Sequence, residues 1–423
     1  EGNPLFVREL VRMLVDDSVI VRTPDGHWQL TIDADAVEVP PTIQSLLAAR
    51  IERLSPEDRR VLEMASVVGA EFSLGALGAL TGETVATTVA LDHMRRRELV
   101  EPTGTYWGDD AVYRFHHVLI RDAAYRRILK ASRAELHERV GDWLQDAEAE
   151  LRREHQVAIA HHFEQASHYL TELGSDIEAA AGLGRRAAAL LCTAATDAMH
   201  RDDLSLASSL AARALGVVPE SDVAARADIL IVACECALAS GEVATASAMT
   251  ADLTALVRHP DADVRLGAWA QCYAAQLIGL TDPAALVDAV VAAAEASRIF
   301  ADAGDGSGEA KAHQVRAGLL ARLGRVGEAE AALDQALAAA RVVDDRSRVT
   351  AILGSVPVAA LFGPSSVARA GGRCLDVVRL LHITSASPSV EATSMRCQAV
   401  LEALRGRFDV ARSLLANART SLE

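Results

Sequence analysis

Residues 324–329 have the sequence Gly324-Arg325-Val326-Gly327-Glu328-Ala329, and this stretch decides the fold because its pattern recurs. A glycine suits the turn between two helices, and an alanine five residues later leaves room where the second helix crosses the first. The same spacing of Gly or Asp to Ala occurs at five more places: Asp202/Ala207, Gly241/Ala246, Gly279/Ala284, Gly363/Ala368 and Gly406/Ala411. Successive turn positions are 39, 38, 45, 39 and 43 residues apart, which is about one helix pair. The sequence therefore predicts a row of antiparallel helix pairs.

This row is expected to form an α-solenoid over residues 176–423. Its units resemble tetratricopeptide repeats, although the mean period of about 41 residues exceeds the usual length of about 34. Only 17 residues follow Gly406, so we expect the array to be cut off at Glu423 without a polar capping repeat. The predicted fold class is mainly α.

Composition supports a helical chain and excludes some partners. Half of the 423 residues are apolar but only 4% are aromatic, so burial must come from Ala, Leu and Val packed closely in helices. The formal charge of -16 repels phosphate backbones and anionic bilayers. No run of 18 apolar residues and no signal-peptide pattern is visible, so we expect a cytoplasmic protein without membrane partners. Contact with DNA through Arg95, Arg96 and Arg97 is not expected, because basic residues also suit a helix C-terminus.

The N-terminal part has a different pattern from the array. An amphipathic helix over residues 2–16 is followed by two β-prone runs around Thr23-Pro24-Asp25-Gly26, which predicts a hairpin. In the next segment we expect four helices, at residues 43–54, 55–68, 74–80 and 85–97. A final pair of strands is expected at residues 99–100 and 112–115. Helices followed by a β-hairpin predict a winged helix over residues 39–130, and residues 131–175 are expected to be linker helices.

Three segments carry a family resemblance when they are taken together. They are Glu1-Gly2-Asn3-Pro4-Leu5-Phe6, Val39-Pro40-Pro41-Thr42-Ile43-Gln44 and Phe115-His116-His117-Val118-Leu119-Ile120. In this order and spacing they resemble the lid and winged helix of bacterial STAND-class AAA-type ATPases, members of which occur in class III adenylate cyclases and LuxR-type regulators. The resemblance implies that residues 1–38 are the remainder of an ATPase lid, and that tetratricopeptide repeats follow the winged helix.

The resemblance also implies two nucleotide-binding residues, Pro4 and His117. Pro4 takes the place of the proline in the family's Gly-x-Pro-Leu sensor, which packs against adenine. His117 takes the place of the histidine in the Met-His-Asp motif, which reaches the β-phosphate of ADP. Here His116 and Val118 replace the family's Arg and Asp beside that histidine. The alternatives are a proline that only starts a helix and a histidine that only packs in the wing.

No sequence pattern predicts catalysis by this chain. It has no Gly-x4-Gly-Lys-Ser/Thr, the motif that cradles the β- and γ-phosphates, so ATP or ADP is expected only in a longer parent protein. Lys311 follows a glycine-rich run at 304–308, but it is displaced from the last glycine. His155, His161, His162 and His168 are spaced seven apart in pairs, about 10.5 Å along a helix, which is too far to share a metal ion. The six cysteines have neither disulfide-framework nor zinc spacing and are expected to be reduced.

Two functions remain open at this point. One is the regulatory and sensor part of a STAND-type ATPase, whose lid and winged helix close over nucleotide held by an upstream P-loop domain while the repeats bind an effector or a protein. The other is a repeat scaffold for protein–protein interaction without a nucleotide role.

Overall fold

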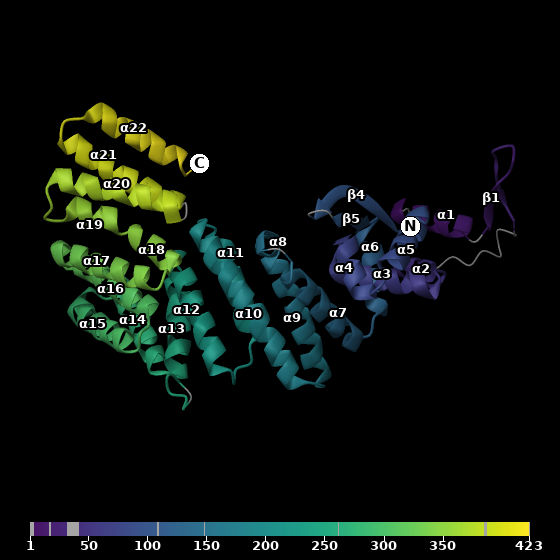
Figure 1. Cartoon of the computed structure of the whole chain (residues 1–423), viewed down its shortest axis with the longest axis horizontal. Coiled ribbons are helices and arrows are strands. Elements are labelled where there is room, and N and C mark those ends of the chain that lie inside the picture. The colour runs from purple at the N-terminus through teal and green to yellow at the C-terminus, as the bar shows by residue number, and fades with distance from the viewer. Residues whose placement is uncertain are drawn as a thin grey trace. The chain divides into compact units, whose positions relative to one another are not determined.

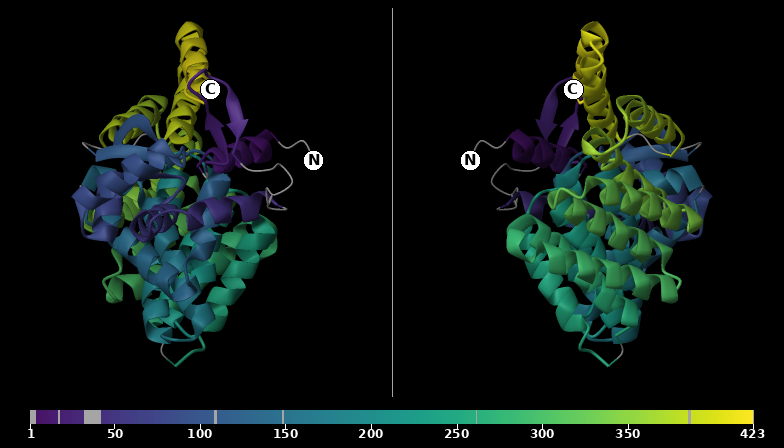
Figure 2. Two further views of the ribbon diagram at one scale, coloured as in Figure 1. Left: turned by 90° about the vertical axis from the view of Figure 1, so that its right-hand side faces the viewer. Right: turned by 90° about the vertical axis from the view of Figure 1, so that its left-hand side faces the viewer.

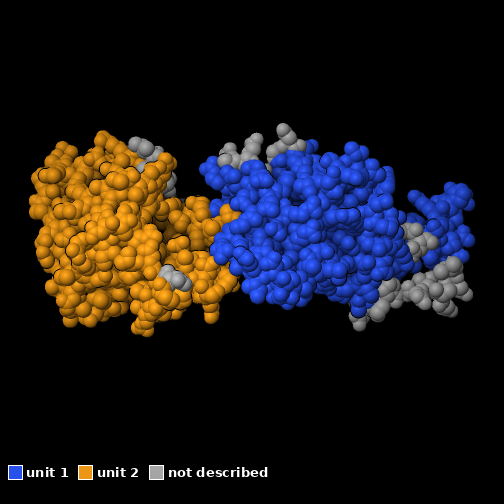
Figure 3. All heavy atoms as spheres, turned by 60° about the horizontal axis from the view of Figure 1, so that its bottom comes forward, with its two compact units in different colours: residues 1–187 blue, residues 188–423 orange. Residues whose placement is uncertain are grey.

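The computed structural model describes residues 4–16, 18–31, 42–107, 110–147, 149–260, 262–384 and 387–422. The chain divides into two compact units, residues 1–187 and 188–423 (Figure 3), and the boundary falls within helix α10 (Ile177–His200). Most described residues are helical.

The first unit begins with a helix and a small hairpin. Helix α1 (Pro4–Asp16) precedes strands β1 (Ile20–Arg22) and β2 (Trp28–Leu30), which pair antiparallel. Gly26 has φ +86°, a left-handed conformation that suits glycine in the tight turn between the strands. The helix and hairpin therefore lie where the sequence predicts them.

Residues 42–115 combine helices with a three-stranded sheet. The elements in chain order are α2 (Ile43–Glu52), α3 (Pro56–Val68), β3 (Glu71–Ser73), α4 (Leu74–Thr81), α5 (Thr84–Arg96), β4 (Val100–Trp107) and β5 (Asp110–Phe115). The sheet is antiparallel in the order β3-β5-β4, so the first strand pairs with the last. Strand β3 was not predicted from the sequence, because three residues between two helices give too short a pattern.

Side-chain caps explain where these helices begin. The Thr42 and Ser45 side chains form a capping box at α2, and the Ser55 hydroxyl accepts the Asp58 N–H at 3.0 Å at the start of α3. The helices and sheet share a core that includes the fully buried Leu62 and Phe72.

Four further helices complete the first unit before its boundary in α10. They are α6 (Val118–Arg127), α7 (Lys130–Gln145), α8 (Ala149–Glu154) and α9 (Gln156–Leu173). Helices α7 and α9 pack along each other. Gly141 permits this approach, because a Cβ there would lie 2.5 Å from the Phe163 ring.

The second unit is a row of helix pairs, seen side by side in Figures 1 and 2. After α10 the helices are α11 (Leu204–Val217), α12 (Val223–Ala239), α13 (Val243–Leu256), α14 (Val264–Thr281), the 3-10 helix η2 (Pro283–Ala285), α15 (Leu286–Asp302), α16 (Gly306–Arg322), α17 (Val326–Val342), α18 (Arg346–Leu353), α19 (Val356–Phe362), α20 (Val367–Thr384), α21 (Pro388–Leu404) and α22 (Phe408–Thr420). Consecutive helices pack together throughout this row, as tetratricopeptide-like helix pairs do.

Five of the six predicted turn positions lie between helices. Asp202, Gly241, Gly324 and Gly406 have φ between +60° and +75°, and Gly363 follows the last residue of α19. Gly279 is wrong as a turn, because it lies inside α14 and the chain turns at Asp282 instead. A Cβ at Gly279 would lie 2.8 Å from Leu319 Cδ2, so this glycine serves the close approach of α14 and α16.

The alanine five residues after each predicted turn is buried at four of the six positions. The side chains of Ala207, Ala246, Ala329 and Ala411 are buried, as expected for residues at helix crossings. Ala284 and Ala368 are exposed, because η2 follows the misplaced turn and α20 begins at Val367, four residues after Gly363.

No single helix among the described residues is both long enough and apolar enough to span a membrane. Helices α4 and α5 together have the length and apolarity of a span, but the chain bends by 119° between them.

Candidate functional site

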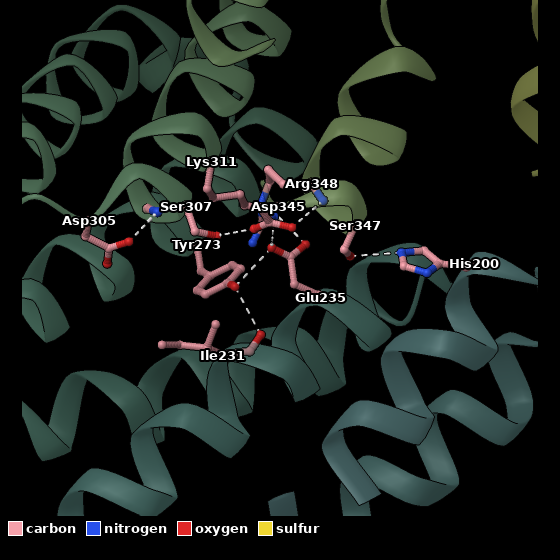
Figure 4. Close-up of polar contacts among 11 residues, drawn as sticks. His200, Ile231, Glu235, Tyr273, Asp305, Ser307, Lys311, Asp345, Ser347 and Arg348 are labelled. Atoms are coloured by element: carbon pink, nitrogen blue, oxygen red, sulfur yellow. Dashed lines mark hydrogen bonds and ion pairs between the residues drawn. The ribbon is translucent and has the colours of Figure 1, made fainter. Parts of the chain in front are cut away.

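Four helices of the array, α12, α14, α16 and α18, each contribute a side chain to a cluster around one carboxylate (Figure 4). Glu235 on α12 accepts hydrogen bonds from Arg348 Nη1 on α18 at 2.6 Å, Lys311 Nζ on α16 at 2.9 Å and the Tyr273 hydroxyl on α14 at 3.1 Å. The same hydroxyl lies 3.0 Å from the Ile231 carbonyl oxygen. We call Glu235, Tyr273, Lys311 and Arg348 the ion cluster. It ties together helices that are up to 113 residues apart in sequence.

Burial gives the ion cluster its electrostatic character. The exposed fractions of the Lys311, Arg348 and Glu235 side chains are 3%, 12% and 20%. Burial alone would raise the pKa of Glu235, but Lys311 and Arg348 outweigh it and lower that pKa to about 2. Burial lowers the pKa of Lys311 even though the Glu235 carboxylate opposes this shift. Glu235 is therefore ionised and shared between two buried cations.

Aspartates at helix starts surround the ion cluster. Asp305 and Asp345 cap α16 and α18 by accepting backbone N–H groups, each at 2.8 Å. The Ser307 hydroxyl donates to Asp345 at 2.6 Å, and Trp269 Nε1–H donates to Asp305 at 3.3 Å. These bonds link the start of α16 to α14 and the start of α18 to α16.

A cavity of about 500 Å³ adjoins the ion cluster, and we call it the junction cavity. Its lining comes from α10, α11, α12, α18 and α21, and includes His200, Leu204, Glu235, Arg348 and Val390. His200 Nε2 lies 2.9 Å from the Ser347 hydroxyl across this cavity. The junction cavity therefore lies where the first and last helix pairs of the array meet.

A second cavity of about 400 Å³ shares Ile231 with the junction cavity. We call it the acidic cavity, because three aspartates and one arginine are its charged lining residues: Asp228, Asp263, Asp305 and Arg265. Its apolar lining includes Leu266 and Trp269. The two cavities therefore lie on either side of Ile231 on α12.

The two predicted nucleotide residues lie on different elements of the first unit. Pro4 is the first residue of α1, and α1 packs against α2. His117 is the N-cap of α6, where its Nδ1 accepts the Leu119 N–H at 3.1 Å, and α6 also packs against α2. Both residues thus start helices that pack on α2, and their contact with nucleotide remains a prediction.

One histidine of α9, His162, takes part in a buried polar chain. His162 Nδ1 lies 2.9 Å from His137 Nδ1 on α7, His137 Nε2 lies 2.8 Å from the Tyr125 hydroxyl, and Tyr125 lies 2.9 Å from the Tyr169 hydroxyl. Burial, with the neighbouring imidazoles, lowers the pKa of His137 to about 2 and that of His162 to about 3. In the part of the chain that the structure describes, no group of three or more His, Cys, Asp and Glu has the arrangement of a metal site.

Sequence reasoning missed the ion cluster, the junction cavity and the role of His137. One signal was available for the cluster, since Lys311 is one of only two lysines in an arginine-rich chain. The glycine-rich run before it is not a phosphate loop but the entry to α16, where a Cβ at Gly308 would lie 2.4 Å from the Phe300 ring.

Comparisons with known proteins give fold-level likeness only. No protein-family model and no curated protein sequence matches the chain. Solved structures that align with it include a STAND protein with a tetratricopeptide repeat sensor from Pyrococcus horikoshii, at 12% identity and TM-score 0.38, covering 91% of this chain and 65% of that one. The apo form of RapI aligns at 13% identity and TM-score 0.46, covering 68% and 98%. Aspartyl phosphate phosphatase F from Bacillus subtilis aligns at 9% identity and TM-score 0.44, covering 100% and 95%.

These TM-scores are all below 0.5, so the assignment of a helix-pair array rests on the geometry described above. The chain spans about two thirds of the length of the Pyrococcus protein. The adenylate cyclase and LuxR parts of the resemblance stay predictions.

Proposed function

We propose that this chain is the regulatory and sensor part of a STAND-type signal-transduction ATPase. In this proposal residues 1–38 are the remainder of the lid, residues 39–130 are a winged helix, residues 131–175 are linker helices, and residues 176–423 are the sensor. ATP or ADP is held mainly by an upstream P-loop domain, and the chain itself is not an enzyme. We place the protein in the cytoplasm.

The sensor role rests on the junction cavity. Its lining includes residues from both ends of the array, on α10 and α21, beside residues of α12 and α18, so a ligand that fills it would contact both ends. A ligand that prefers one spacing of those ends would shift the array toward that spacing, because only differential affinity moves a conformational equilibrium. The observation that carries the proposal is therefore that helices α10 and α21 share one cavity.

The nucleotide role rests on the motif resemblance and on the topology of residues 42–115. From α3 onward the order helix, strand, two helices and hairpin is the order of a winged helix, and Pro4 and His117 both lie at helix starts next to that unit. His117 Nδ1 serves as the helix cap. The remaining ring nitrogen, Nε2, is the atom we assign to the ADP β-phosphate, since an imidazole N–H can donate to phosphate oxygen.

The alternative is a nucleotide-independent scaffold that holds a partner protein on the array. The cap at His117 favours this alternative, because it gives the histidine a structural role without nucleotide. The two functions differ in one respect: only the sensor function requires that a change in the array alters nucleotide binding.

The experiment uses the protein in which this chain follows a P-loop ATPase domain. Replacing Asp202 by Gly and Ser389 by Ala together removes the side-chain contact between the array ends, and release of fluorescent ADP is measured in stopped flow. The sensor function predicts a change in release rate of at least severalfold. A control carrying Asp252→Asn, an exposed position on α13, should leave the rate unchanged. An unchanged rate in the double variant would contradict the sensor function and favour the scaffold.

A further inference from the structure

One helix of the array is broken where the repeat pattern predicts a continuous one. Helix α16 has 17 residues and begins after its cap Asp305. The stretch from Arg346 to Phe362 has the same length and begins after its own cap, Asp345. This stretch nevertheless forms two helices, α18 and α19, because Pro357 has no N–H to donate to the Leu353 carbonyl and its ring crowds that carbonyl.

The break opens a cavity in the array. The preceding helices α14 and α16 pack along each other, with Leu319 of α16 against Gly279 of α14. One repeat later α16 packs on α18, but along the described lengths of α16 and α19 these two helices are not in close contact. A cavity of about 650 Å³ lies between α16, α17 and α19, and Gly354 and Ser355 at the break line it. We call it the apolar cavity.

The walls of the apolar cavity are mainly hydrocarbon and carry one charge. Leu333, Val358 and Phe362 line it together with four alanines. Val358 and Phe362 are 42% and 71% exposed, so large apolar side chains of the lining face water. The charged lining residue is Arg322 at the end of α16, and among the described residues no acidic side chain pairs with it. Pockets of about 300–1,000 Å³ with apolar walls and few polar groups are typical of small-molecule sites.

We infer that the apolar cavity binds a small amphiphilic acid, with a hydrocarbon body between α17 and α19 and one carboxylate at Arg322. The hydrocarbon body would remove Val358 and Phe362 from water, and the guanidinium fork matches a carboxylate. A single cation in a chain of formal charge -16 favours a singly charged head group over a phosphate, which brings further negative charge.

This site goes beyond the proposed sensor function. The apolar cavity shares no lining residue with the junction cavity, and binding of an acid there requires neither a nucleotide nor an upstream domain. The site can therefore be tested on the 423-residue chain alone.

Gly318 offers a way to fill the apolar cavity without disturbing the fold. It lies in α16 on the cavity wall, and a Cβ at this position would meet no atom within 4 Å. Leucine is also a better helix former than glycine. Gly318→Leu should therefore fold normally and occupy the cavity. Gly216→Leu is the matched control, because Gly216 lies in helix α11 with equally open surroundings and does not line the cavity.

The test uses two fluorescent probes with the same body, 11-(dansylamino)undecanoate and its neutral primary amide. Dansyl emission shifts to the blue when the probe leaves water, and a titration gives its Kd. We expect Gly318→Leu to weaken binding of the acid about tenfold or more, and Gly216→Leu to leave it unchanged. The amide should bind about three- to fivefold more weakly than the acid, because Arg322 is an exposed cation. Arg322→Gln should remove this difference by weakening the acid alone.

Three results would overturn the proposal. One is unchanged binding of the acid to Gly318→Leu, or an equal loss in both leucine variants. The second is equal affinity of the unaltered chain for the acid and the amide. The third comes from sedimentation velocity: a dimer of the unaltered chain that Gly318→Leu dissolves would mean that a second copy covers the cavity. None of these results would touch the sensor function, which the ADP release rate tests separately.

Discussion

The Asp202 carboxylate accepts the Ser389 hydroxyl at 2.9 Å and the Ser389 backbone N–H at 3.2 Å, although 187 residues separate the two. Asp202 lies in the turn between α10 and α11 with φ +60°, and Ser389 is in the first turn of α21. This contact joins the beginning of the array to its last helix pair. Both residues also line the junction cavity, so a ligand in that cavity would lie next to this contact.

The first prediction concerns the coupling between these two residues. Asp202→Gly removes the carboxylate, and glycine adopts the left-handed backbone conformation of this position without strain. Ser389→Ala removes the hydroxyl. A double-mutant cycle in urea unfolding should give a coupling energy of about 0.5–1 kcal/mol, since both residues are at the surface. Additivity within experimental error would mean that the contact contributes nothing to stability.

The second prediction concerns the ion cluster, which contains two cations and one carboxylate. Glu235→Gln leaves both cations buried without a counter-charge and should destabilise the chain by about 3–5 kcal/mol. Lys311→Met leaves a balanced Glu235–Arg348 pair and should cost less than about 1.5 kcal/mol. Urea unfolding measures both, and a larger effect for Lys311→Met would contradict the assignment of Glu235 as the shared partner.

The third prediction concerns the buried histidines His137 and His162. Their folded pKa values, about 2 and about 3, lie below the unfolded value of about 6.5, so the unfolded chain binds more protons in the intervening range. Their contribution to stability is complete above pH 6.5 and is lost as the pH falls below it, by up to about 1.4 kcal/mol per pH unit for each histidine.

His162→Gln should therefore flatten the fall in the free energy of unfolding between pH 6.5 and pH 4.5 relative to the unaltered chain. His168→Gln is the matched control, because it replaces an exposed histidine on the same helix. If both variants show the same pH dependence, the buried pair is not the source of the acid sensitivity.

The fourth prediction concerns the small residues at helix crossings. Ala329 is 1% exposed and Ala368 is exposed, although both follow the same sequence rule. Ala329→Leu should overpack the crossing and cost about 1–3 kcal/mol, whereas Ala368→Leu should change stability by less than about 0.5 kcal/mol. Thermal unfolding of the two variants decides this, and equal melting temperatures would reject the register assigned to α17.

The repeat spacing predicted the array because turns and crossings leave a local mark in the sequence. It failed at Gly279, where a glycine needed for the contact with Leu319 has the same spacing as a turn glycine. The partners within the ion cluster and the Asp202–Ser389 contact could not be predicted, since each contact joins helices that lie far apart in the chain. No single repeat carries that information. His137 was missed for a similar reason, because its partner His162 lies on another helix.

The central claim is that this chain closes over nucleotide held by an upstream domain, with His117 contacting ADP. The measurement is a calorimetric ADP titration of the protein that carries the P-loop domain, with His117→Asn as the variant. Asparagine keeps the N-cap of α6 and removes the ring nitrogen, so stability should be unchanged while affinity falls. A charge-assisted contact of about 1.5–3 kcal/mol predicts about 10- to 150-fold weaker binding of ADP.

His116→Ala should leave the affinity unchanged, and the 423-residue chain alone should bind ADP weakly at best. Equal affinity of the unaltered protein and His117→Asn, or micromolar binding by the isolated chain, would contradict the account.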